Sequence, residues 1–124
     1  MTNPGELKQA SKLINTAAIA QYAAITDDYN PIHMDAEFAA KTEMGGIIAH
    51  GMLSLILIWQ ALNATFGPDV VTRTVLDVRF TRPVRVDDVV TGGGTLREGS
   101  SGDYDVWVKN QNGETVIKGS AVIA

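Results

Sequence analysis

The segment Asp28–His33 combines residue types that are used in acid–base catalysis. It contains Asp28, Asn30, Pro31 and His33, and His33 is one of only two histidines among 124 residues. An imidazole gives or takes a proton near neutral pH. A carboxylate can orient the imidazole or act as a second base, and a side-chain amide can hold a water molecule. Because Pro31 restricts the backbone between them, these groups suit the addition of water to a double bond, or its removal.

The same residues also fit an ordinary turn. Asp and Asn side chains satisfy backbone groups in turns, and the residue before a proline avoids the helical region. Asp28, Asn30 and Pro31 alone therefore do not require a catalytic role. His33 favours the catalytic interpretation, because a turn does not need an imidazole.

The second histidine, His50, lies with Gly51 at the expected start of a long helix. A helix N-terminus offers unpaired backbone N–H groups and a partial positive charge. Gly51 would let an acyl group approach this backbone closely, so His50 and Gly51 form a candidate oxyanion or substrate-binding site for a thioester carbonyl. In the alternative interpretation, Gly51 only permits tight packing and His50 only caps the helix.

The elements that position these residues follow from the hydrophobic pattern. Residues 50–66 are apolar on nearly all sides, which predicts a helix buried on nearly all sides. Shorter helices are expected at 17–25 and 36–41, with Thr16 and Asp35 as N-caps. Alternation and turn signals, including the hairpin signal Asn112–Gly113, predict the remaining strands. These strands are expected at residues 6–14, 74–81, 88–96, 104–109 and 114–123.

This order of elements predicts an α+β fold in which an antiparallel sheet wraps around a long buried central helix. Residues 1–124 are expected to form a single domain. One sheet of this size does not cover every side of a helix and also hide its own edges. We therefore expect a homodimer.

Composition and charge narrow the function classes. The chain is 45% hydrophobic and 19% charged, as in globular proteins, and it has no cysteine for a disulfide, a thiolate metal site or a nucleophile. A net charge of −4 disfavours nucleic-acid binding. We see no secretion signal and no membrane span, and expect a cytoplasmic protein. Four arginines lie close together in sequence and fit either a small anionic ligand or a protected sheet edge. They are Arg73, Arg79, Arg82 and Arg85.

Segments 22–33 and 48–52 together resemble the MaoC-like (R)-specific enoyl-CoA hydratases, and segments 78–84 and 87–90 resemble strand segments of that family. The resemblance implies a hot-dog fold and reversible hydration of trans-2-enoyl-CoA to (R)-3-hydroxyacyl-CoA, without metal or organic cofactor. It implies that Asp28 and His33 are the catalytic pair, that Asn30 helps to hold the water, and that the Gly51 amide binds the thioester oxygen. The implied partner is an acyl thioester of CoA or of a carrier protein.

The chain departs from the family pattern at three positions. Asp27 and Asp87 stand where relatives often have glycine, and Trp59 stands where some relatives carry a serine on the buried helix. Two other functions stay open, a hot-dog acyl-CoA thioesterase and a non-catalytic acyl-thioester binding module. The resemblance implies that many hot-dog thioesterases carry an acidic residue on the buried helix. In this chain, residues 50–66 contain neither Asp nor Glu.

Overall fold

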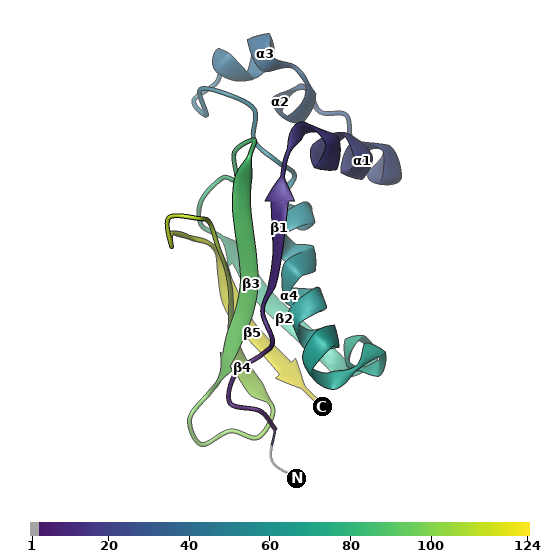
Figure 1. The fold of residues 1–124 in the computed structure, drawn as a ribbon, viewed down its shortest axis with the longest axis vertical. Coiled ribbons are helices and arrows are strands. Elements are labelled where there is room, and N and C mark those ends of the chain that lie inside the picture. Colours follow the sequence, from purple (N-terminus) through teal and green to yellow (C-terminus); the bar gives the residue numbers. More distant parts are fainter. Residues whose placement is uncertain (1–2) are drawn as a thin grey trace.

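The computed structural model describes residues 3–124 and shows one antiparallel sheet with a long helix beside it (Figure 1). The sheet has five strands in the order β1-β3-β4-β5-β2. The hot-dog prediction is thereby confirmed. The elements in chain order are β1 (Ala10–Ile14), α1 (Thr16–Thr26), α2 (Pro31–Met34), α3 (Ala36–Ala40), α4 (Gly51–Phe66), the 3₁₀-helix η1 (Pro68–Arg73), β2 (Thr74–Phe80), β3 (Asp88–Leu96), β4 (Asp103–Lys109) and β5 (Thr115–Ile123).

The core lies between α4 and the concave face of the sheet. Leu57, Ile58 and Leu62 on α4 are fully buried. The helix approaches β3 so closely that a Cβ added at Gly92 would lie 2.8 Å from the backbone of Leu57. The absence of a side chain at Gly92 therefore lets helix and sheet backbones come together, which fixes the position of α4 along β3.

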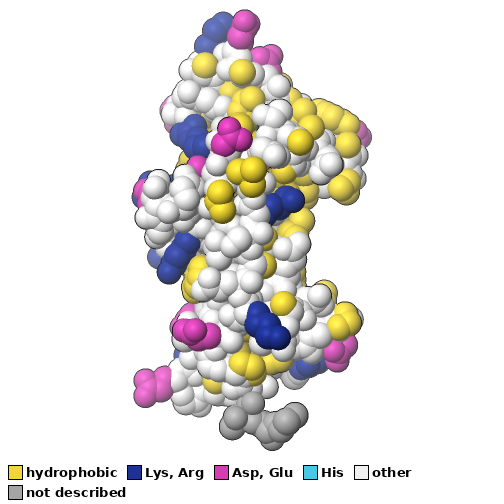
Figure 2. Space-filling view, viewed as in Figure 1, with side chains coloured by type: hydrophobic (Ala, Val, Ile, Leu, Met, Phe, Trp, Pro, Cys, Tyr) yellow, Lys and Arg dark blue, Asp and Glu magenta, His cyan; other side chains and the backbone are white. Residues whose placement is uncertain are grey.

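One side of α4 is not covered by the chain. Met52 is 53% exposed and Ile56 is 38% exposed, although α4 contacts β1, β3 and β4 of the sheet. Hydrophobic side chains are visible along the same side of the molecule in Figure 2. This agrees with the expectation that one sheet does not cover every side of the helix. Within residues 3–124, no helix has both the length and the hydropathy needed to cross a membrane.

Two local details differ from the sequence-based expectation. The N-cap of α1 is Asn15 rather than Thr16, because the Asn15 side-chain oxygen accepts a hydrogen bond from the Ala18 amide at 2.9 Å. Residues 31–34 form the short helix α2 instead of an extended turn. Pro31 occupies the first turn, where its fixed φ suits a helix and its missing N–H costs nothing, and the Asn30 side chain caps the helix.

Candidate active site

The candidate site lies at the end of the sheet where the three short helices meet the N-terminus of α4 (Figure 1). A tight turn after α1 presents Asp28 there. Asp27 takes the left-handed conformation, with φ 57° and ψ 31°, and the Asp28 amide then donates to the Ala23 carbonyl at 3.1 Å. The helix is thus ended by a left-handed residue of the kind that is usually glycine, and the chain turns towards α2.

Asp28 and Asn30 make the contacts of a local turn. The Asp28 carboxylate accepts a hydrogen bond from the backbone N–H of Asn30 at 3.3 Å. The Asn30 side-chain oxygen accepts from the Ile32 amide at 3.1 Å. The turn interpretation therefore accounts for the side-chain oxygen of Asn30. These contacts also fix the start of α2, and His33 belongs to this short helix.

His33 is held in one tautomer. Its Nδ1 atom lies 2.6 Å from the Ile48 carbonyl oxygen. A carbonyl oxygen only accepts hydrogen bonds, so Nδ1 carries the proton and donates. In the neutral form of this ring, Nε2 carries the lone pair and is the atom that can accept a proton.

His50 is a buried packing partner of His33. Its side chain is 3% exposed, and the two imidazole rings stack with centroids 3.9 Å apart at an angle of 27°. Its Nε2 atom donates to the Asp28 carbonyl oxygen at 2.9 Å, while Nδ1 is buried without a partner among the described residues. Although His50 occupies the N-cap position of α4, its side chain makes no capping hydrogen bond. It connects the Asp28 turn, His33 and the start of α4.

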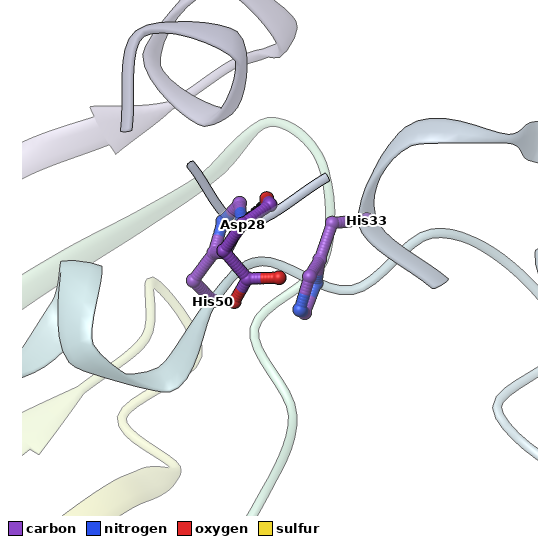
Figure 3. Close-up of side chains that lie close together, drawn as sticks. All are labelled: Asp28, His33 and His50. Carbon is purple, nitrogen blue, oxygen red and sulfur yellow. Dashed lines mark hydrogen bonds between the residues drawn. The ribbon is translucent and has the colours of Figure 1, made fainter. Parts of the chain in front are cut away.

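Asp28, His33 and His50 lie side by side (Figure 3), and one potential ligand atom of each lies within 4.8 Å of the others. The geometry of this cluster does not suit a metal ion. In two stacked rings the nitrogen lone pairs lie in nearly parallel planes, so they do not converge on one ion about 2 Å from each nitrogen. The arrangement fits proton transfer between a carboxylate, an imidazole and a bound water better than it fits metal coordination.

A cavity of about 380 Å³ opens beside His33 and Gly51. Its walls are mainly apolar and include Phe80 and Ile117. Gly51 is the first residue of α4, where the backbone N–H has no partner inside the helix. A Cβ at Gly51 would lie 2.8 Å from the Phe80 ring, so a side chain at this position would displace Phe80. The candidate oxyanion donor and the imidazole thus border the same cavity.

Sequence reasoning missed one polar residue of this cavity. Ser54 is 1% exposed, lies on the cavity wall, and its hydroxyl has no hydrogen-bond partner among the described residues. The signal in the sequence was a lone serine in an apolar run, one turn after Gly51. Trp59, which stands at the position of the family serine, is only partly buried and packs against the core.

The four arginines do not act as a single cluster in the described structure. Arg73 lies 3.8 Å from Asp69 and Arg82 lies 3.1 Å from Glu114. Arg85 donates to the Met44 carbonyl oxygen. Of the four, only Arg82 borders the cavity. Neither a bound anion nor protection of the sheet edge is tested by these contacts, and the role of the arginines stays a prediction.

Comparison with known proteins agrees with this architecture. Residues 3–117 match the family model described as the MaoC like domain. The chain belongs to the MaoC-like domain family. It is 31% identical to the (R)-specific enoyl-CoA hydratase of Aeromonas caviae over 123 residues, which cover 96% of this chain and 92% of that relative. It is 39% identical over 80 residues to the 3-hydroxybutyryl-CoA dehydratase of Methylorubrum extorquens, covering 64% of this chain but only 50% of that relative.

Solved structures of MaoC-like proteins share the fold over nearly the whole chain. The unliganded R-hydratase PhaJ1 from Pseudomonas aeruginosa superimposes with a TM-score of 0.81 at 30% identity, covering 99% of this chain and 81% of that one. The (R)-hydratase from A. caviae gives a TM-score of 0.79 at 28% identity, with coverages of 99% and 95%. The family is therefore one of hydratases and dehydratases.

Proposed function

We propose that this protein is an (R)-specific enoyl-CoA hydratase that reversibly converts trans-2-enoyl-CoA to (R)-3-hydroxyacyl-CoA. The observation that carries the proposal is the position of His33, whose imidazole lies beside Asp28 and lines the same cavity as Gly51. A base, a carboxylate and a backbone donor are the groups that hydration of a conjugated thioester needs. CoA and carrier-protein thioesters share this reacting group, so both are candidate substrates.

The geometry suggests how the atoms move. The water oxygen forms a bond to C3 of the enoyl group while the His33 Nε2 accepts a water proton, since Nδ1 is committed to the Ile48 carbonyl. The electrons of the double bond move towards the thioester oxygen, where the Gly51 amide stabilises the charge. Asp28 stabilises the imidazolium, and C2 then takes a proton from the pair. Asn30 helps to orient the water, and none of these steps requires a metal or an organic cofactor.

The test is loss of the absorbance of crotonyl-CoA, with free thiol measured in the same samples. We expect rapid loss of absorbance without thiol release. Asp28→Asn and His33→Ala should each lower kcat/KM by about 10²–10⁴-fold. Asp27→Asn, which changes the neighbouring exposed carboxylate, is the matched control and should keep near-normal activity. Thiol release would identify a thioesterase, and tight binding without either change would identify a binding module.

We also propose that residues 1–124 form one domain that pairs as a homodimer. One hydrophobic cluster runs from Leu7 to Ala121, which supports a single core. The exposed apolar side chains Met52 and Ile56 support a partner over the open side of α4. We expect a dimer by light scattering, and Ile56→Glu should shift it to a monomer. Ser101→Glu, on an exposed loop, is the control. A monomeric unmodified protein would contradict the proposal.

A further inference from the structure

Most polar side chains at the cavity already have partners. The Thr81 hydroxyl donates to the Thr115 carbonyl oxygen at 2.8 Å. The Arg82 guanidinium pairs with Glu114 at 3.1 Å. These groups are satisfied without a ligand, so they do not explain what the cavity binds.

Three residues that line this cavity carry a polar group that is not committed to another described residue. The groups are the Gly51 N–H, the Nε2 of His33 and the Ser54 hydroxyl. The first two belong to the proposed hydration chemistry, and Ser54 has no role in it so far. A buried hydroxyl without a partner loses its hydrogen bonds to water and gains none in return. Such a group is expected where a ligand supplies the missing partner.

A serine inside a helix usually satisfies itself by donating to the carbonyl four residues earlier. Thr65, near the other end of α4, does this by donating to the Ala61 carbonyl oxygen at 2.7 Å. Ser54 makes no such bond to His50, nor to any other described residue. The hydroxyl of Ser54 therefore differs from the other hydroxyl of the same helix in being left free at the cavity.

The position of Ser54 indicates which ligand atom it reaches. Residues three apart on a helix lie on the same face, with Cβ atoms about 5–6 Å apart, so Ser54 lies one turn beyond Gly51 on the flank that borders the cavity. A carbonyl oxygen has two lone pairs and accepts two hydrogen bonds. We propose that Ser54 is a catalytic residue whose hydroxyl donates to the substrate's thioester carbonyl oxygen, together with the Gly51 amide.

This inference rests on the proposed function, since it places the thioester oxygen at Gly51. In the reaction, negative charge grows on that oxygen as water adds to C3. A donor aimed at it therefore contributes more in the transition state than in the bound substrate. The loss of Ser54 should accordingly lower kcat more than it raises KM.

The kinetic test compares three variants on α4. Ser54→Ala removes the hydroxyl, Ser54→Cys keeps most of the volume but has a weak donor, and Thr65→Val removes the hydroxyl that is already satisfied. We expect both Ser54 variants to lower kcat/KM for crotonyl-CoA by about 10²-fold and Thr65→Val to leave it within twofold. Full activity of either Ser54 variant would overturn the proposal.

Thermal unfolding separates this role from a structural one. Because the Ser54 hydroxyl makes no bond in the free protein, Ser54→Ala should keep or raise Tm. Thr65→Val should lower Tm, since it removes the bond to Ala61. If Ser54→Ala lost activity and also lost as much Tm as Thr65→Val, the hydroxyl would be structural and the proposal would fail.

A binding experiment tests Ser54 without turnover. Asp28→Asn is mixed with the conjugated thioester 2,4-hexadienoyl-CoA, whose absorbance moves to longer wavelength when its carbonyl is polarised. We expect a red shift that becomes smaller in the double variant with Ser54→Ala. An unchanged shift would overturn the role of Ser54. A protein that hydrates no enoyl-CoA but shows this difference would contradict the proposed function while supporting the Ser54 contact.

Discussion

Replacing Asp27 by glycine should stabilise the protein without impairing the site beside it. Asp27 has φ 57° and ψ 31° at the end of α1, in the left-handed region that disfavours residues with a Cβ. Its exposed side chain makes no hydrogen bond or ion pair with any of residues 3–124. The substitution Asp27→Gly therefore removes conformational strain and costs no described contact.

The expected gain follows from two opposing effects. The left-handed region costs an L-residue about 1–2 kcal/mol, and aspartate lies at the lower end because its short polar side chain tolerates this region. Glycine loses about 0.5–1 kcal/mol more backbone entropy on folding. A net gain of at most about 0.5 kcal/mol remains. With about 2.1 cal/mol/K per residue over 124 residues, the unfolding entropy at Tm is about 260 cal/mol/K. The gain corresponds to at most about 2 °C in Tm.

The assay is calorimetric unfolding of the unmodified protein, Asp27→Gly and Asp27→Ala at one pH. Alanine keeps the Cβ but lacks the short polar side chain that lets aspartate tolerate the left-handed region. The Tm of Asp27→Ala should therefore fall, while that of Asp27→Gly should rise. Asp27→Gly should retain activity, because the bond from the Asp28 amide to the Ala23 carbonyl oxygen is unchanged. If glycine lowered Tm as much as alanine, the strain assigned to Asp27 would be wrong.

Two further predictions concern β5 and the loop that precedes it. A Cβ at Gly119 would lie 2.0 Å from the Asp77 carbonyl oxygen. Gly119→Ala should therefore separate β5 from β2 and lower the free energy of unfolding by about 3 kcal/mol, as measured by urea unfolding. Unchanged stability would contradict the register of β5 and β2. The pKa of Glu114 is lowered by the hydrogen bond from Asn110 and by the charge of Arg82. Its stabilising contribution is therefore present above the unfolded value near 4.5 and is lost as pH falls through the lower folded pKa. Glu114→Gln should lower Tm at pH 7 and match the unmodified protein at low pH, and an equal difference at both would rule this contribution out.

The main elements were predictable because their patterns are long and local. The strand expected at residues 88–96 coincides with β3, and the apolar run at 50–66 differs from α4 only at its first residue. The Asn112–Gly113 signal lies in the loop between β4 and β5, as predicted, although only Gly113 has a positive φ, of 76°. The exposed side of α4 at Met52 and Ile56 was also expected, because one sheet of this size does not cover every side of a helix.

The departures from the family pattern acquired a physical meaning only from the backbone. Asp27 and Asp87 both stand where relatives often have glycine, and they are the two non-glycine residues among 3–124 with positive φ, 57° and 70°. The sequence showed that glycine was missing at both positions. It did not show that both turns keep the positive φ that favours glycine. Asp27 and Asp87 therefore lie in strained turns.

Some contacts among the site residues were readable from the sequence, and others were not. Asp28, Asn30 and His33 are close because they share one turn, and this was readable from their spacing. The stacking of His50 on His33 joins residues 17 positions apart, and it depends on how the start of α4 meets the turn after α1. That placement is set by tertiary packing, which no local pattern of residues 28–33 or 50–52 contains.

Ser54 is not the family serine displaced along the helix. Trp59, at the position of that serine, lies five residues after Ser54, and five residues turn an α-helix by about 140° relative to the starting direction. The two positions therefore face different surroundings, Ser54 the cavity at Gly51 and Trp59 the packed core. A hydroxyl at position 54 cannot replace a contact made from position 59. Its proposed partner is accordingly a different atom, the thioester oxygen that is proposed to bind one turn away at the Gly51 amide.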